Sequence, residues 1–95
     1  MTNKQRAFLS SLATKETAIL SVGKADVTPE MIAACDEAIE KRELIKISVL
    51  KNCFSDPKEI AAVIAERTRS EVVRVIGKKI ILYRPAKKPV IELPK

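Results

Sequence analysis

The residues of this sequence best suited to hold a ligand are Gly23 and Lys24, which stand between a short apolar run and a helix start at Thr28-Pro29. Glycine adopts backbone conformations that are closed to other residues and lets a ligand's own backbone come close. A helix that begins at Pro29 directs unpaired N–H groups and a partial positive charge toward the same loop. Lys24 adds a mobile full charge, so the segment suits a phosphate of a nucleic-acid backbone. A plain strand-to-helix turn with a solvated lysine is the alternative interpretation.

Four further cations are candidates for the same role: Lys4 and Arg6 near the N-terminus, and Lys78 and Lys79 in a turn. Each pair alone is also typical of solvated surface residues or of edge-strand protection. The charge distribution favours a binding role. Residues 1–24 contain four Lys and Arg against one Glu, residues 74–95 contain seven against one Glu, and the middle of the chain is net acidic. With a net charge of +6, the two basic ends predict one positive face whose natural partner is a polyanion.

The sequence lacks the residues that metal binding, disulfide formation or catalysis would need. The sequence contains no histidine, and the spacing of its two cysteines, Cys35 and Cys53, fits neither a zinc site nor a disulfide framework. We expect two reduced, buried thiols. The sequence has no nucleophile motif, no glycine-rich phosphate loop of the P-loop type and no carboxylate pair in a suitable context. It therefore predicts a protein that is not an enzyme and that uses no cofactor, metal or small-molecule substrate.

The composition predicts a single domain. Of its 95 residues 46% are apolar, which is enough for a modest core, and 32% are charged. The longest apolar runs fall far short of the roughly 20 residues that cross a membrane, so we expect no membrane partner. The N-terminus opens no apolar stretch with a small-residue cleavage site, so we expect no signal peptide. These features predict a cytoplasmic monomer.

Capping residues and periodicity predict the elements that position the cations. Three helices should begin at cap residues: Thr2, which forms a capping box with Gln5, Thr28 before Pro29, and Asp56 before Pro57. Phe8 falls on the apolar side of the first helix, and we expect it in the core. The expected strands are Ala18–Val22, Leu44–Leu50, Glu71–Ile76 and Lys79–Tyr83, the last two joined as a hairpin through Gly77-Lys78.

The element order α-β-α-β-α-β-β predicts the fold class, because strands separated by helices need crossover connections. We expect a compact α/β sandwich with a four-stranded mixed sheet and three helices. The domain should span residues 1–85, and residues 86–95 should form a basic, proline-containing tail. Val90, Ile91 and Leu93 are the candidates to dock that tail.

Five stretches of the sequence, in this order and spacing, resemble the CRM-domain family (chloroplast RNA splicing and ribosome maturation) in its single-domain bacterial, YhbY-like form. They cover nearly the whole chain. They are Lys4-Gln5-Arg6 with Leu9 and Leu12, Val22-Gly23-Lys24, Glu43-Leu44-Ile45-Lys46, Asp56-Pro57-Lys58-Glu59-Ile60-Ala61, and Val75-Ile76-Gly77 followed by Ile80 to Pro85.

The resemblance implies a fold similar to the C-terminal domain of bacterial translation initiation factor three. It also implies RNA binding through a basic surface with a Gly-x-x-Gly-type loop, and association with ribosomal RNA in precursors of the large ribosomal subunit. By position, Gly23 and Lys24 match the first glycine of that loop and its basic residue. This sequence has Asp26 where the family has the second glycine. Asp tolerates a left-handed backbone, but its carboxylate near the phosphate path is expected to weaken the loop's grip a few-fold.

Recognition should depend on phosphate contacts and RNA shape. The chain has three aromatic residues, Phe8, Phe54 and Tyr83, which argues against a stacking platform. The residues expected to contact RNA are Gly23, Lys24, Lys4, Arg6, Lys78 and Lys79.

Two other functions are compatible with parts of the sequence. The first is a protein-interaction module that docks on ribosomal proteins or an assembly factor through the acidic helix face of Asp36, Glu37 and Glu40. The second is DNA binding by a recognition helix in a major groove. Neither internal helix suits that role well, since one is acidic and the other carries its arginines only at its C-terminal end.

Overall fold

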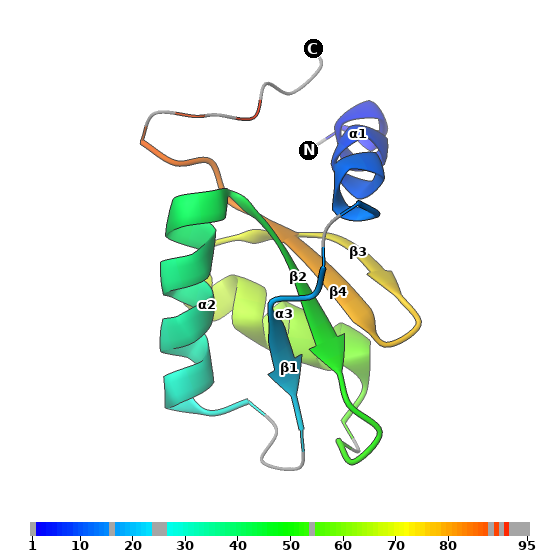
Figure 1. Cartoon of the computed structure of the whole chain (residues 1–95), viewed down its shortest axis with the longest axis vertical. Coiled ribbons are helices and arrows are strands. Elements are labelled where there is room, and N and C mark those ends of the chain that lie inside the picture. The colour runs from blue at the N-terminus through cyan, green and yellow to red at the C-terminus, as the bar shows by residue number, and fades with distance from the viewer. Residues whose placement is uncertain are drawn as a thin grey trace.

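The structure, a computed structural model, describes residues 2–15, 17–23, 27–53, 55–87, 89 and 91. Its helices and strands follow the predicted order (Figure 1). The helices are α1 (Asn3–Ala13), α2 (Pro29–Arg42) and α3 (Pro57–Thr68). The strands are β1 (Leu20–Val22), β2 (Leu44–Val49), β3 (Glu71–Ile76) and β4 (Lys79–Tyr83). They form one mixed sheet in the order β1-β2-β4-β3, which confirms the predicted fold class.

The three helices begin where their capping residues predict. Thr2 Oγ1 accepts a hydrogen bond from the Gln5 N–H, and Gln5 Oε1 accepts one from the Thr2 N–H, which completes the capping box. Thr28 and Asp56 cap α2 and α3, and a proline follows each of them. Each cap satisfies an N–H that the helix itself leaves unpaired, which stabilises the helix by about 1 kcal/mol.

The last strand of the chain lies inside the sheet. β1 pairs with β2 in parallel, whereas β2 and β3 both pair antiparallel with β4. The β3–β4 hairpin turns through Gly77 and Lys78, and Gly77 has φ +56°, which L side chains rarely adopt. Gly23, in contrast, is not among the glycines with positive φ, so its own backbone conformation does not require glycine.

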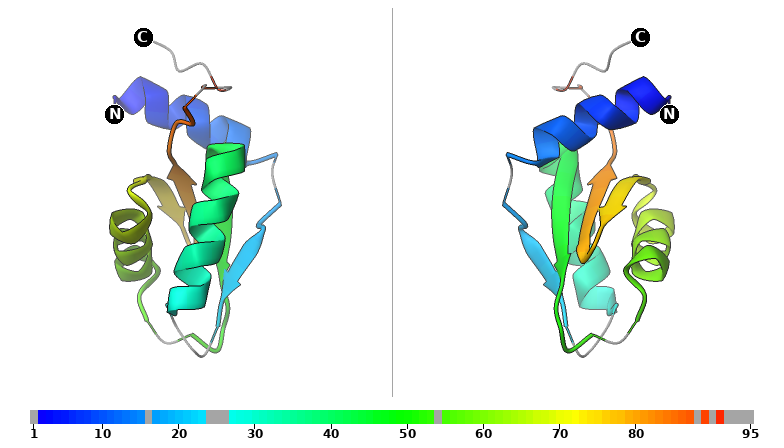
Figure 2. Two further views of the ribbon diagram at one scale, coloured as in Figure 1. Left: turned by 90° about the vertical axis from the view of Figure 1, so that its left-hand side faces the viewer. Right: turned by 90° about the vertical axis from the view of Figure 1, so that its right-hand side faces the viewer.

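Each face of the sheet packs against different helices, because successive side chains of a strand point to opposite sides. Ile45 and Ile47 of β2 belong to the larger core cluster with residues of α2 and α3. Leu44, Ile81 and Tyr83 belong to a second cluster with Leu9 and Ala13 of α1. The α2–α3 face is therefore covered along its length, whereas α1 lies over only one end of the other face. In the right-hand view of Figure 2, α1 crosses the upper end of the sheet and no described helix stands in front of the strands below it.

Two expectations about side chains have opposite outcomes. Phe8 does not lie in the core, because 36% of it is exposed while its neighbour Leu9 is fully buried. Leu9 therefore faces the sheet and turns Phe8 to the side of α1. Cys35 and Cys53 are both buried and free, as predicted, and burial raises the pKa of Cys35 to about 11. The strand predicted from Ala18 begins at Leu20.

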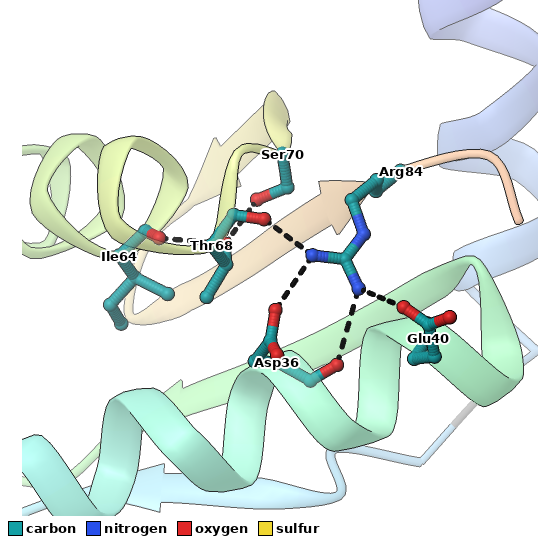
Figure 3. Close-up of polar contacts among 6 residues, drawn as sticks. All are labelled: Asp36, Glu40, Ile64, Thr68, Ser70 and Arg84. Atoms are coloured by element: carbon teal, nitrogen blue, oxygen red, sulfur yellow. Dashed lines mark hydrogen bonds and ion pairs between the residues drawn. The ribbon is translucent and has the colours of Figure 1, made fainter.

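Arg84 joins three elements at the end of β4 (Figure 3). Its guanidinium donates to the Thr68 carbonyl at 2.6 Å, to Asp36 Oδ1 at 2.7 Å and to Glu40 Oε2 at 2.8 Å. These partners belong to α3 and α2, so one side chain ties both helices to the sheet. Thr68 is itself held by hydrogen bonds from its hydroxyl to the Ile64 carbonyl and with the Ser70 hydroxyl.

Glu43 connects the domain to residues beyond the predicted boundary at 85. It is 1% exposed and has φ +66°, unusual for a residue with a side chain. Its carboxylate accepts hydrogen bonds from the N–H groups of Ala86 and Ile91, both at 3.0 Å. Of the residues expected to dock the tail, Ile91 contacts the core cluster under α1, and Val90 and Leu93 lie outside the described residues. The boundary itself stays a prediction.

Among the described residues there is neither a membrane-spanning helix nor a cluster of metal ligands. None of the described helices is long and apolar enough to cross a membrane. No group of three or more Cys, Asp or Glu side chains within these residues is placed to hold a metal ion.

Candidate nucleic-acid interface

The part of the sheet that α1 leaves open carries three cations and three uncharged residues. Strand register places them in two rows, because paired residues of neighbouring strands point to the same side. The row nearer the hairpin turn contains Ser21, Ser48, Lys79 and Ile76, and the next row contains Lys46 and Arg74 on either side of Ile81. We call six of these residues, all except the buried Ile81, the basic sheet face. From standard strand spacing, its three cationic residues lie about 8–10 Å apart at their Cα atoms.

Among the described residues, no carboxylate forms an ion pair with a cation of the basic sheet face. Glu71 is exposed on the same side of the sheet, one row nearer α1, where it is paired with Tyr83. None of the ion pairs between described residues includes Lys46, Arg74 or Lys79. Those ion pairs join Arg84 and Lys41 to carboxylates of α2, on the other side of the sheet. Acidic groups are thus gathered and partly paired on α2, and unpaired positive charge is gathered on the open sheet.

A β-bulge places Arg74 on this face. Strict alternation from Glu71 would point Arg74 toward α3 and bury its guanidinium in the core. The register shifts between Val72 and Arg74, so that Arg74 is paired with Ile81. As a result, Val73 is 4% exposed and packs under α1, whereas Arg74 is exposed on the same side of the sheet.

Arg6, one of the predicted contact residues, is bound at this bulge. Its Nη1 donates to the carbonyl oxygens of Val72 and Val73, and the side chain is half-buried. Arg6 therefore connects α1 to the irregular part of β3. Because a guanidinium has five N–H donors, the other nitrogens can still meet a phosphate. The predicted contact of Arg6 with RNA stays a prediction.

Lys79 and Lys78 lie at the hairpin end of the face. Lys79 is exposed and its Nζ donates to Ser48 Oγ at 2.8 Å, which holds the ammonium over the sheet. Lys78 is exposed in the turn, and its carbonyl accepts the Val49 N–H at 2.7 Å. That bond fixes the turn against the end of β2.

Gly23 directly follows β1 and lies at the same end of the sheet as the hairpin turn. The Leu50 N–H donates to the Val22 carbonyl at 2.8 Å, directly after the bond between Val49 and the turn. A Cβ at Gly23 would lie 3.4 Å from the Asn52 side chain, an ordinary van der Waals contact, so the described neighbours leave room for a methyl group there. Lys24 and Asp26 lie outside the described residues, and the loop's phosphate contact stays a prediction.

Lys4 is the predicted residue farthest from this end. It is exposed on the first turn of α1, which crosses the opposite end of the sheet (Figure 2). The structure thus brings Gly23, Lys78 and Lys79 together at one end and places Arg6 and Lys4 toward the other. The basic sheet face lies between them.

Sequence reasoning missed Lys46 and Arg74 as site residues. The alternation of Lys46 with Ile45 and Ile47 did indicate a polar side of β2, but nothing local showed that α1 leaves this side open. Arg74 could not be assigned to a face, because the bulge before it breaks the alternation. An excess of cations over carboxylates at alternate strand positions is the signal that could have found Lys46.

The fold and its basic face define a member of a known family: the chain belongs to the CRS1 / YhbY (CRM) domain family, whose match covers residues 1–84. It is 45% identical to the probable RNA-binding protein YqeI of Bacillus subtilis, over 99% of both chains. It is 30% identical to an RNA-binding protein of Haemophilus influenzae, over 100% of this chain and 96% of that one. The solution structure of a candidate RNA-binding protein from Staphylococcus aureus superposes with a TM-score of 0.84 at 46% identity, over 99% of both chains.

Proposed function

We propose that this protein binds RNA through the basic sheet face. The observation that carries the proposal is the set of three cations, Lys46, Arg74 and Lys79, that stand on an open sheet without a carboxylate partner among the described residues. Such a surface neutralises phosphates and releases their counterions, which supplies most of the affinity of sequence-independent binding. Relatives over the full chain length are named RNA-binding proteins, which supports the same partner.

The mode of recognition follows from what the face lacks. Tyr83 is the aromatic residue of the sheet, and it is 5% exposed beneath α1. Without an exposed ring among the described strands, bases cannot stack on this face as they do on an RRM sheet. The face therefore reads the phosphate path and the shape of the RNA, with Ile76 as its apolar surface, 47% exposed.

Flanking residues extend the binding path at both ends. Gly23 and Lys78 lie at the hairpin end, where Lys24 adds its charge if the family loop is used, and Arg6 and Lys4 lie toward α1. A strand of RNA that follows this path meets cations over the whole width of the sheet. We assign the protein no catalytic step, cofactor or metal.

Gel-shift titration with a transcript of large-subunit ribosomal RNA tests the binding. Wild-type protein should shift the transcript at moderate salt, and Lys46→Ala combined with Arg74→Ala should weaken the shift at least tenfold. Lys41→Ala with Lys58→Ala is the matched control, since both are exposed lysines on the helical side. A control variant that weakens binding equally would show that total charge, rather than this face, determines affinity.

We further propose that the RNA bound in the cell is ribosomal RNA in precursors of the large subunit, and that the protein acts on them as a cytoplasmic monomer. Sedimentation of a lysate through a sucrose gradient tests this step. Co-migration with large-subunit precursors is the expected result, and it should be lost in the Lys46→Ala/Arg74→Ala variant. A pool found only at the top of the gradient would contradict the assembly role while leaving RNA binding intact.

The alternative of a protein-interaction module on the acidic face of α2 gains no support. Asp36 and Glu40 are ion-paired with Arg84 and Glu37 with Lys41, so each of these carboxylates already has a cationic partner within the domain. We therefore do not adopt it.

A further inference from the structure

A cleft at the α1 end of the sheet has a chemistry of its own. It has a volume of about 400 Å³ and is lined by Leu12, Lys15, Arg42, Leu44 and Ile91. These residues come from the end of α1, the end of α2, the start of β2 and the segment after β4. The hairpin turn lies at the other end of β2, so the cleft is separate from the row of Lys79.

The floor and the rim of the cleft differ in character. Leu12 and Ile91 are partly buried against the core cluster that contains Leu44, which gives an apolar floor. Lys15 and Arg42 are exposed at the rim, and neither takes part in the ion pairs found between described residues. An apolar surface beside two cations matches one unpaired nucleotide, whose base has an apolar face and whose phosphate is an anion.

One wall of this cleft is built by residues outside the family match. The match ends at residue 84, and Ile91 is held in place by its N–H bond to the buried Glu43 carboxylate. The same carboxylate accepts a hydrogen bond from the Ala86 N–H, so Glu43 binds two positions that follow β4. The wall is thus anchored to the domain.

We propose that this cleft binds a single unpaired nucleotide, with its base against Leu12, Leu44 and Ile91 and its phosphate between Lys15 and Arg42. The inference rests on the proposed RNA binding and gives it a preference, because a nucleotide in a helix cannot enter a cleft with its base. A purely structural role is the competing explanation, since cations at helix C-termini stabilise the helices. The two explanations differ in what the rim cations do to RNA affinity.

Two RNA hairpins of the same stem distinguish them, each closed by a non-nucleotide linker so that the loop offers no unpaired base. One hairpin is blunt and the other has a single-stranded 3′ extension. By fluorescence anisotropy, Lys15→Ala/Arg42→Ala should weaken binding of the extended hairpin at least fivefold more than binding of the blunt one. Ile91→Ala should have the same selective effect with the rim charges intact, because the base loses apolar contact area on the floor. Lys41→Ala/Lys58→Ala removes the same charge elsewhere and should affect both hairpins equally. Equal weakening of the two hairpins by the rim variant would overturn the proposal.

Methyl NMR spectra identify the source of the nucleotide. Signals of Leu12, Leu44 and Ile91 should shift on titration with a short single-stranded oligonucleotide. If nucleoside monophosphates shift them too, the cleft also takes free nucleotides, which supports the same site; if neither probe shifts them, the proposal fails. This experiment is independent of the basic sheet face. If the protein binds neither hairpin but shows these shifts, the proposed RNA binding is refuted, whereas the proposed nucleotide site in the cleft is supported.

Discussion

Neutralising the basic sheet face should change how RNA binding depends on salt. The triple variant Lys46→Ala/Arg74→Ala/Lys79→Ala removes three cations that have no carboxylate partner among the described residues. Each phosphate contact contributes about 0.7 to the slope of log K against log salt for a single strand and about 0.9 for a DNA duplex. If each of the three cations meets one phosphate, the slope should flatten by about 2.1–2.7.

The corresponding change in affinity is large enough to measure. Between about 50 and 200 mM salt, wild-type protein should lose about 20–40-fold more affinity than the triple variant does. Fluorescence anisotropy of a labelled RNA hairpin over this salt range gives both slopes. Circular dichroism should show both proteins folded, because the substituted side chains stand on the surface and Lys79 loses a single exposed hydrogen bond to Ser48.

The control for this prediction carries the same loss of charge on the helical side. Lys41→Ala/Lys58→Ala/Arg67→Ala replaces three exposed cations of α2 and α3. Its slope should stay within about 0.5 of the wild-type slope. The reasoning is refuted if the control flattens the slope as much as the sheet variant, or if the sheet variant leaves the slope unchanged.

Three predictions concern the fold. Arg84→Ala should lower the free energy of unfolding, measured by urea titration, by about 2 kcal/mol. The reason is that the Thr68 carbonyl loses its donor and two partly exposed ion pairs are broken. A loss below about 0.5 kcal/mol would contradict the role of Arg84 in joining α2 and α3 to the sheet. Gly77→Ala should lower the free energy of unfolding by about 1 kcal/mol. A Cβ at Gly77 meets nothing within 4 Å, so the cost comes from the positive φ alone. Gly77→Asn should lower it by less in the same titration, because Asn tolerates a positive φ better than Ala. Burial raises the pKa of Cys35 from 9.0 to about 11, so the folded protein holds a proton that the unfolded chain releases. Stability should therefore fall as pH rises through this window, and more in wild type than in Cys35→Ala when the two are unfolded in urea at pH 8 and pH 10.5.

Helices and turns were predicted correctly where the sequence signal for them is local. Thr2 with Gln5 and Thr28 with Pro29 fix the starts of two helices within four residues, and Gly77 fixes the hairpin turn in the same way. The prediction that Phe8 lies in the core was wrong, because apolar periodicity alone does not distinguish two neighbouring positions on a helix. The packing of α1 against the sheet buries Leu9 instead of Phe8.

The candidate site was only partly predictable, since its decisive features are contacts between distant segments. Charge counts indicated a basic face but could not locate it, because the open half of the sheet depends on where α1 packs. The bulge that exposes Arg74 is bound by Arg6 from 66 and 67 residues away. Arg84 was part of the family resemblance, but its partners on α2 lie 44 and 48 residues earlier.

The position of β4 has a consequence for the order in which the protein can fold. A chain that grows from its N-terminus makes β4 last of the seven elements, yet β4 separates β2 from β3 in the sheet. Until it is made, β2 exposes an unpaired edge, β3 has no strand to pair with and Arg74 has no fixed place. A chain whose synthesis has not reached β4 therefore lacks the assembled basic sheet face. Until β4 pairs with β2 and β3, the nascent chain is open to strand pairing with other chains.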